Sequence, residues 1–188
     1  IMNICARRLN RLGRLNRSTM VATVMSNLGL EIALNRAGIQ LIRTAVGDRY
    51  VVEQLRQSDL NFGGEQSGHL IFLDHGTTGD GILAALQTLV AMKEEGQSLA
   101  DLAKLMEPLP QVLLNVRVTQ MKDIAANQAI VEQADKVARH LKGRGRIVLR
   151  PSGTEPVIRV MLEGDDLEEI NALAEETADI VRREMSNA

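Results

Sequence analysis

The alternation of hydrophobic and polar positions changes near residue 108, and each side of that point predicts its own kind of fold. Before it, short apolar runs alternate with amphipathic stretches, which is typical of strands and helices that follow one another. The expected strands are 19–26, 39–46 and 70–73, and the expected helices are the first stretch of the chain, 27–36, 49–57, and two segments that begin at 81 and 98. This order predicts an α/β layer with a largely parallel sheet.

After Pro108 and Pro110, which read as a linker, the pattern changes. The expected order is a strand over 112–119, a helix over 126–141, two strands over 147–149 and 157–162, and a helix over 165–185. Such a β-α-β-β-α order predicts a small α+β domain with an antiparallel sheet and helices on one face. We therefore expect two domains, covering 1–107 and 112–188.

Residues at helix ends sharpen these predictions. Asn27 and Asp48 are expected to cap helix N-termini, and Gly38 is expected to close the first of these helices. Asp80 lies between glycines and is interpreted as a helix cap. The helix that follows it is expected to have one apolar face, made of Ile82, Leu83, Leu86, Leu89 and Val90.

Composition narrows the possible partners. The 188 residues include 22 basic and 24 acidic side chains, giving a net charge of −2, which gives no general attraction to nucleic acid or anionic membrane. One tyrosine, two phenylalanines and no tryptophan offer no aromatic platform for stacking bases. The only cysteine, Cys5, forms no internal disulfide, and no apolar run reaches membrane-spanning length. We expect a cytoplasmic protein with a small-molecule ligand.

The loop 150–156, Arg-Pro-Ser-Gly-Thr-Glu-Pro, joins two expected strands and contains the groups that bind phosphate. Arg150 offers a planar two-pronged donor, and Ser152 and Thr154 add hydroxyls. Gly153 lets backbone N–H groups turn inward around an anion. No Gly-Lys-Ser/Thr follows, so this is not a nucleotide P-loop. The alternative is a polar hairpin turn with a surface arginine.

A second polar cluster lies at 63–69, Gly-Gly-Glu-Gln-Ser-Gly-His. In an extended segment residues two apart share a face, so Glu65, Ser67 and His69 are expected to point together. A carboxylate can accept hydrogen bonds from two neighbouring sugar hydroxyls, and Gly64 and Gly68 leave room for a ligand. The alternative is a flexible glycine-rich loop with ordinary surface side chains.

Together these stretches resemble the α-D-phosphohexomutase superfamily, and within it the bacterial phosphoglucosamine mutase branch. The resemblance runs from about Thr19 onward and is weakest over the basic stretch 7–17. Its motifs are 46–51, 64–69, 77–81 and 150–156 with 158–160, in the order of the superfamily. It implies the later part of a three-layer α/β third domain, followed by the whole fourth domain.

The resemblance also implies an activity. Such enzymes interconvert hexose 6-phosphates and 1-phosphates, here glucosamine phosphates for cell-wall precursor synthesis, through a phosphoserine, Mg²⁺ and a hexose 1,6-bisphosphate intermediate. It implies sugar binding by Glu65, Ser67, His69, Asp48 and Arg49. It implies phosphate binding by Arg150, Ser152, Gly153, Thr154 and Arg159. For Arg159, exposure to solvent or pairing with Glu155 is an equal alternative.

Two elements of the superfamily are absent from the sequence, namely a Ser-His-Asn-Pro stretch and an Asp-x-Asp-x-Asp stretch. We therefore expect no catalytic residue and no Mg²⁺ ligand in this chain, and no turnover by the chain alone. Asp74 and His75 are interpreted as a polar strand end because no further metal ligands are spaced around them. Left open are a phosphomannomutase or phosphoglucomutase, a non-catalytic phosphosugar-binding module, a structural scaffold, and a homo-oligomer.

Overall fold

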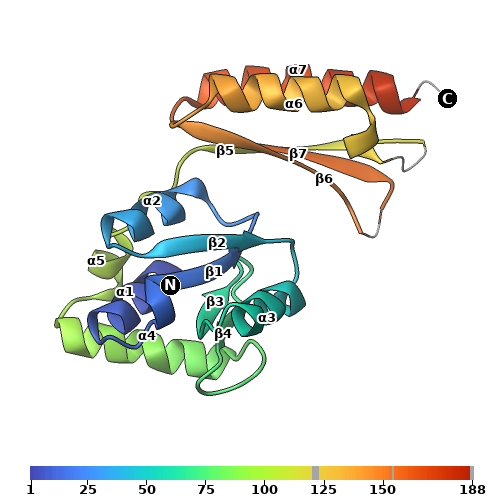
Figure 1. Cartoon of the computed structure of the whole chain (residues 1–188). Coiled ribbons are helices and arrows are strands. Elements are labelled where there is room, and N and C mark those ends of the chain that lie inside the picture. Colours follow the sequence, from blue (N-terminus) through green and yellow to red (C-terminus); the bar gives the residue numbers. More distant parts are fainter. Residues whose placement is uncertain (120–122, 154, 187–188) are drawn as a thin grey trace. The chain divides into compact units, whose positions relative to one another are not determined.

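The computed structural model describes residues 1–119, 123–153 and 155–186, and these form two compact units. Unit 1 is Ile1–Pro108 and unit 2 is Leu109–Ala188 (Figure 1). The chain passes from unit 1 to unit 2 at Pro108 and Pro110. Neither proline has a backbone N–H to donate to a helix or a sheet. Over the described residues, no helix has both the length and the apolarity needed to cross a bilayer. Each unit is described by itself below.

Unit 1 contains a four-stranded sheet and five α-helices. Its elements are α1 (Met2–Arg11), η1 (Asn16–Ser18), β1 (Thr19–Thr23), α2 (Leu28–Arg36), β2 (Gln40–Thr44), α3 (Asp48–Gln57), β3 (Phe62–Gly64), β4 (Leu70–Phe72), α4 (Gly81–Glu95) and α5 (Leu99–Ala103). The strand order is β2-β1-β3-β4, with β1 parallel to β2 and β3. Only β4 runs antiparallel, against β3. The predicted α/β class with a largely parallel sheet is confirmed, and β3 is an element that the sequence pattern did not reveal.

Both faces of this sheet are covered, which gives three layers. Successive strand residues point to opposite faces, so Met20 and Ala22 point away from Val21. Met20 and Ala22 pack in a core with residues of α1, α2 and α4, including Leu30. Val21 packs instead with Leu55 of α3 on the other face. The predicted three-layer arrangement is therefore confirmed.

Two arginines of the basic stretch near the start of the chain, Arg8 and Arg11, pair with α4, which lies beside α1 (Figure 1). Arg8 Nη2 lies 2.8 Å from Glu94 Oε1, and Arg11 Nη2 lies 3.1 Å from Glu94 Oε2. A third pair joins Arg11 to Glu95 at 3.1 Å. The pairs of Arg11, whose side chain is 49% exposed, contribute little stability each, whereas Arg8 is only 10% exposed.

Helix α4 forms where expected, but most of its predicted apolar face is exposed, and of the five residues only Leu83 is partly buried against the core. Ile82 is 77% exposed and Leu86 is 55% exposed. The buried positions are Ala84, Thr88 and Ala91. Small side chains let a helix approach its neighbours closely, and hydrophobic periodicity alone does not show which side of a helix does so.

Two of the three predicted N-cap residues cap their helices in the structure, and one does not. Asn27 Oδ1 accepts from Gly29 N at 2.9 Å, and Asp80 Oδ1 accepts from Leu83 N at 2.9 Å, as expected of N-caps. Asp48 is not the N-cap of α3. Gly47 occupies that position without a side-chain bond, and Asp48 is the first helical residue. An acidic residue in the first turn still complements the helix dipole.

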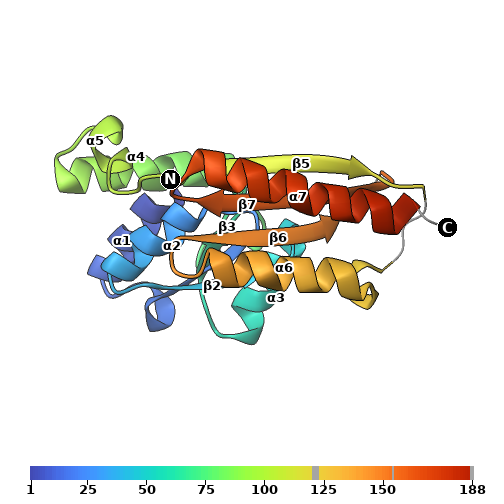
Figure 2. The ribbon, with the colours of Figure 1, turned by 90° about the horizontal axis from the view of Figure 1, so that it is seen from above.

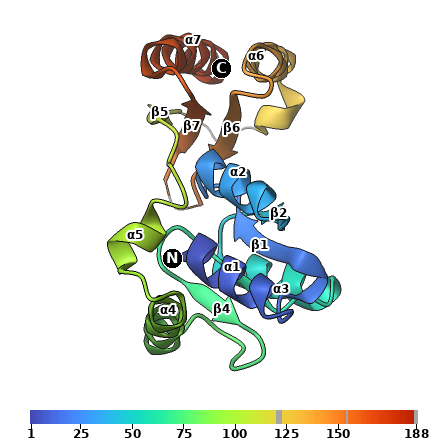
Figure 3. The ribbon, with the colours of Figure 1, turned by 90° about the vertical axis from the view of Figure 1, so that its left-hand side faces the viewer.

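Unit 2 contains a three-stranded antiparallel sheet with both long helices on one face. Its elements are β5 (Gln111–Arg117), η2 (Ile124–Ala126), α6 (Gln128–His140), β6 (Gly145–Pro151), β7 (Val157–Gly164) and α7 (Leu167–Ser186). The strand order is β5-β7-β6. Figure 3 shows α6 and α7 nearly end-on, side by side on the same side of the strands, and Figure 2 shows them lengthwise from above. The predicted β-α-β-β-α order, sheet and helix placement are confirmed.

The core of unit 2 lies between the helices and one face of the sheet. Val116, Ile158 and Val160 are almost fully buried there, together with Val137 of α6 and Ala174 of α7. Because strand residues alternate, the intervening positions of the three strands point to the face away from the helices. That second face carries the polar residues discussed below.

A cluster of charges joins the loop after α6 to the start of α7. Arg144 Nη1 donates to Glu169 Oε2 at 2.7 Å, and His140 Nε2 lies 2.7 Å from Glu169 Oε1. These contacts, Arg144 first, lower the pKa of Glu169 to about 2. His140, the last residue of α6, therefore has a structural partner.

The acid stability of the chain is expected to depend on Glu169. Its folded pKa of about 2 lies below the ordinary 4.5, so its contribution is complete above pH 4.5 and is lost as the pH falls towards 2. In urea unfolding at several pH values, wild-type stability should fall more steeply over this window than that of Glu169→Gln. Glu168→Gln, which removes a neighbouring charge from the same turn, should keep the steep fall. Parallel curves for wild type and Glu169→Gln would contradict this assignment.

Candidate functional site

The cluster at 63–69 is built as a tight hairpin between β3 and β4. Gly64 pairs with Leu70 at the ends of the two strands. Beyond them, Glu65 N donates to the carbonyl of His69 at 2.9 Å, and Gly68 N donates to the carbonyl of Glu65 at 3.1 Å. Gly68 has a φ of 102°, a conformation that favours glycine. The alternative of a flexible glycine-rich loop is therefore not what the structure shows.

Glu65 is the centre of this hairpin. Its side chain is buried, and its Oε1 accepts a hydrogen bond from Gly47 N at 2.9 Å. The other oxygen, Oε2, accepts from Ser67 Oγ at 3.4 Å and lies 3.5 Å from His69 Nδ1. Ser67 Oγ also lies 3.2 Å from His69 Nδ1. The prediction that these three side chains point together is confirmed, while their role in sugar binding stays a prediction.

The bond from Gly47 brings the loop before α3 to the carboxylate of Glu65, a link that the sequence did not indicate. Asp48 and Arg49 follow directly, and Arg49 donates to Tyr50 Oη at 2.6 Å. Its guanidinium stacks on the Tyr50 ring, 4.5 Å from the centroid. A cavity of about 480 Å³ adjoins this loop and is lined by Asp48, Arg49, Val52, Glu53, Arg56, Gln57 and Thr77.

The stretch 77–81 supports the same hairpin from the other side. A Cβ added at Gly79 would lie 3.2 Å from the Cβ of His69, so the backbone passes directly against that histidine. Asp80 then caps α4. Three of the motifs from the sequence, 46–51, 64–69 and 77–81, thus lie in contact within unit 1, with Glu65 and His69 between them.

Substitution of Gly47 by alanine is expected to cost about 1–3 kcal/mol of unfolding free energy. Gly47 has a φ of 131°, and an added Cβ would lie 3.3 Å from the Tyr50 ring. A shift of this residue would also move the N–H that holds Glu65. Urea unfolding measures the loss, and Gly76→Ala is the control, because an added Cβ there meets nothing within 4 Å. Equal effects of the two changes would contradict the argument.

In unit 2 the loop 150–156 connects β6 to β7. Ser152 N donates to the carbonyl of Val157 at 2.8 Å, which closes the turn, and the Ser152 side chain is buried. Gly153 is exposed, and an added Cβ there would meet nothing within 4 Å. Thr154, predicted to bind phosphate, lies outside the described residues. The backbone of the turn therefore stays open to a ligand at Gly153.

Two arginines face each other across the strands that carry this loop. Arg150 of β6 is paired in register with Arg159 of β7. The Nε atoms of both are buried, and neither has a hydrogen-bond partner within the described structure. Burial, and then the neighbouring charge of Arg159, lower the pKa of Arg150. No ion pair joins Arg159 to Glu155 among the residues described, so that alternative finds no support.

Two like charges on neighbouring strands destabilise a sheet. A bound anion would remove that cost and satisfy the unpartnered donors, and a guanidinium pair matches the oxygens of a phosphate. The arrangement of Arg150, Arg159, Ser152 and Gly153 is therefore suited to a phosphate group. Its binding of phosphate remains a prediction.

Asp74, at the end of a predicted strand, is engaged in a structural contact. Asp74 Oδ2 accepts from Asn61 Nδ2 at 2.8 Å, in keeping with its interpretation as a polar strand end. Within residues 1–119, 123–153 and 155–186, no three His, Cys, Asp or Glu side chains are grouped to hold a metal ion. The described residues therefore do not fit a magnesium site of their own.

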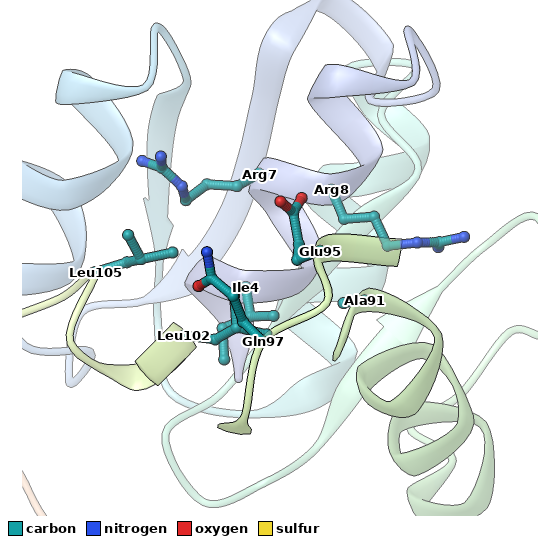
Figure 4. A pocket seen from close by; sticks show the side chains of 8 residues that line it. All are labelled: Ile4, Arg7, Arg8, Ala91, Glu95, Gln97, Leu102 and Leu105. Carbon is teal, nitrogen blue, oxygen red and sulfur yellow. The ribbon is translucent and has the colours of Figure 1, made fainter. Parts of the chain in front are cut away.

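A separate cavity of about 190 Å³ lies between α1, α4 and α5 (Figure 4). Its lining is Ile4, Arg7, Arg8, Ala91, Glu95, Gln97, Leu102 and Leu105. Ile4, Ala91 and Leu102 also form a small apolar cluster at this junction. None of the predicted site residues lines this cavity, so we interpret it as a packing gap between helices.

Comparison with known families matches both units. The family described as phosphoglucomutase/phosphomannomutase, alpha/beta/alpha domain III, matches residues 1–109. The phosphoglucomutase/phosphomannomutase C-terminal domain matches residues 113–180.

The chain is also similar to curated phosphoglucosamine mutases. A phosphoglucosamine mutase of Geotalea daltonii is 52% identical over 188 residues, which is all of this chain and 41% of that protein. A phosphoglucosamine mutase of Citrifermentans bemidjiense is 54% identical over 185 residues, 98% of this chain and 41% of that protein. The chain thus spans about two fifths of the length of the relatives it matches.

Solved structures share the fold. N-acetylphosphoglucosamine mutase of Aspergillus fumigatus matches with a TM-score of 0.84 at 18% identity, over 98% of this chain and 43% of that one. The same enzyme in complex with GlcNAc-6P and magnesium matches with a TM-score of 0.79 at 18% identity, over 98% and 44% of the two chains. At this identity the likeness concerns the fold alone.

Proposed function

This chain belongs to the phosphoglucomutase/phosphomannomutase family, and from that membership we propose that it is the substrate-binding part of a phosphoglucosamine mutase. The whole enzyme would interconvert glucosamine 6-phosphate and glucosamine 1-phosphate. The observation that carries the proposal is the register pair Arg150 and Arg159, partly buried beside the open turn at Gly153, with Nε atoms that are buried and have no hydrogen-bond partner. The identity of about 52% to curated phosphoglucosamine mutases favours glucosamine as the sugar.

The phosphate that does not react would bind in unit 2. Arg150 and Arg159 supply charge-assisted hydrogen bonds, and Ser152 and Gly153 supply donors from the turn. We include Thr154 among these residues on the strength of the sequence alone. Binding energy from this remote phosphate would hold the reacting end of the sugar in position for transfer.

The sugar hydroxyls would bind in unit 1. The Gly47 N–H fixes Glu65 Oε1, so the carboxylate is held in one orientation before any ligand arrives. Its Oε2 makes long contacts, 3.4 Å to Ser67 Oγ and 3.5 Å to His69 Nδ1, which a sugar hydroxyl can replace with a shorter hydrogen bond. His69, with a side chain 60% exposed, adds a donor beside it. Asp48 and Arg49 would contact the substrate from the loop before α3.

The phosphoryl-transfer chemistry belongs to parts of the whole enzyme that this sequence does not contain. There a phosphoserine would exchange its phosphoryl group with the sugar through a hexose 1,6-bisphosphate, and Mg²⁺ would stabilise the charge on that group. The residues of this chain bind and orient the sugar phosphate. We expect the enzyme to work in the cytoplasm, where Cys5 stays a buried thiol.

A chimaera tests this proposal. The matching two fifths of the Geotalea daltonii phosphoglucosamine mutase would be replaced by this chain, and turnover of glucosamine 6-phosphate would be measured. We expect an active enzyme that loses most of its kcat/KM on Glu65→Gln, whereas Glu132→Gln on the exposed face of α6 should have little effect. Competition with mannose and glucose phosphates would report the preferred sugar. A folded chimaera without mutase activity would overturn the proposal.

A further inference from the structure

The face of the unit 2 sheet that points away from the helices carries a row of polar residues from all three strands. Asn115 of β5 is paired in register with Arg159 of β7, which is in turn paired with Arg150 of β6. Val116 and Ile158, one position along their strands, are buried against the helices. Asn115, Arg159 and Arg150 therefore share the opposite face, with neighbouring Cβ atoms about 5 Å apart.

Arg117 extends this row along β5. It lies two residues after Asn115 on the same face and diagonally across from Arg159, about 7–8 Å away between Cα atoms. Both Asn115 and Arg117 are exposed, and nothing in the described part of unit 2 is hydrogen-bonded or ion-paired to either side chain. The surface thus has three arginines and an amide without partners.

The acidic side chain on this face of the sheet lies away from the row of arginines. The acidic residue of β7 that shares it is Glu163, which is paired in register with Arg146 and binds it at 2.6 Å. Glu163 lies four residues beyond Arg159, so it does not neutralise the arginine row. An array of cations that the fold leaves unbalanced attracts anions, and its repulsion is relieved when one binds.

We propose that Asn115 and Arg117 are further binding residues for the phosphate ester, so that the phosphate surface spans all three strands and not only the loop 150–156. This rests on the proposed function and extends it to β5. Asn115 donates through Nδ2 to a phosphate or ester oxygen beside Arg159. Arg117, at the exposed edge of the sheet, draws the dianion to the site and contacts it through its guanidinium.

The test uses the full 188-residue chain labelled with ¹⁵N and titrated with glucosamine 6-phosphate. Binding is followed at the Ser152 and Gly153 amides. Arg117→Gln and Asn115→Ala should each weaken binding about 10- to 100-fold, as expected for loss of a hydrogen bond to a charged group. Arg117→Lys should keep most of the affinity. The control is Arg139→Gln, which removes the same charge from the exposed face of α6 and should change nothing.

The outcomes separate the two proposals. If wild type leaves the Ser152 and Gly153 amides unmoved, the proposed function fails and this extension fails with it. If wild type binds but Arg117→Gln and Asn115→Ala bind as tightly as Arg139→Gln, only the extension is overturned. Both substituted side chains are exposed, so urea unfolding curves should match wild type and exclude loss of fold as the cause of weaker binding.

Discussion

Replacement of Arg150 by glutamine is expected to lower the affinity for glucosamine 6-phosphate about 10- to 100-fold, because a hydrogen bond to a charged group contributes about 1.5–3 kcal/mol. The same change should leave the free chain at least as stable as wild type. It removes a partly buried cation whose Nε has no partner and which stands opposite Arg159. Binding and stability should therefore respond in opposite directions, as in sites where function is maintained at the cost of stability.

Arg146→Gln is the matched control, since Arg146 lies on the same strand and the same face. Its Nε donates to the fully buried Glu163 at 2.6 Å, so its loss should lower stability and change phosphosugar affinity far less. Affinity is measured by titration, and stability by urea unfolding. If Arg150→Gln destabilised the chain as Arg146→Gln does and kept wild-type affinity, Arg150 would be a structural residue only.

Phe62→Ala is expected to have the largest effect on stability, about 3–5 kcal/mol of unfolding free energy. Phe62 is fully buried in β3, and its ring lies 4.6 Å from that of Phe72 on the neighbouring strand. The cavity left by its removal lies under the strand that leads into Glu65. Sugar binding should therefore weaken along with stability.

Ile82→Ala provides the comparison for Phe62→Ala. Ile82 was expected on the apolar face of its helix but is 77% exposed, so its truncation should cost less than about 0.5 kcal/mol. Urea unfolding of the two variants measures both values. A loss at Ile82 comparable with that at Phe62 would contradict the packing of α4 described here.

The sequence predicted most elements because their patterns are local. Short apolar runs marked β1, β2 and β7, and residues such as Asn27 marked helix starts through bonds to nearby N–H groups. The strand β3 escaped because it has only three residues, two of them glycines, and shows no period. The buried face of α4 escaped because its contacts are small residues such as Ala84 and Ala91, which periodicity does not rank above leucines.

The sequence likewise revealed some residues of the candidate site and not others. Glu65, Ser67 and His69 were found because they lie within one short polar segment, although a tight turn and not an extended strand brings their side chains together. The bond from Gly47 to Glu65 was missed because it spans 18 residues and uses a backbone donor, which side-chain chemistry does not reveal. The row that includes Asn115 depends on β5 pairing with β7, a tertiary pairing that no local pattern encodes.

The most direct test of the central proposal is an amide titration of the ¹⁵N-labelled chain with three ligands at millimolar concentration. Glucosamine 6-phosphate should shift the amides of both loops, Gly64 to Gly68 in unit 1 and Ser152 with Gly153 in unit 2. Inorganic phosphate should shift only those of unit 2, and glucosamine only those of unit 1. If glucosamine 6-phosphate left both loops unmoved, the assignment of this chain as the sugar- and phosphate-binding part of the enzyme would be contradicted.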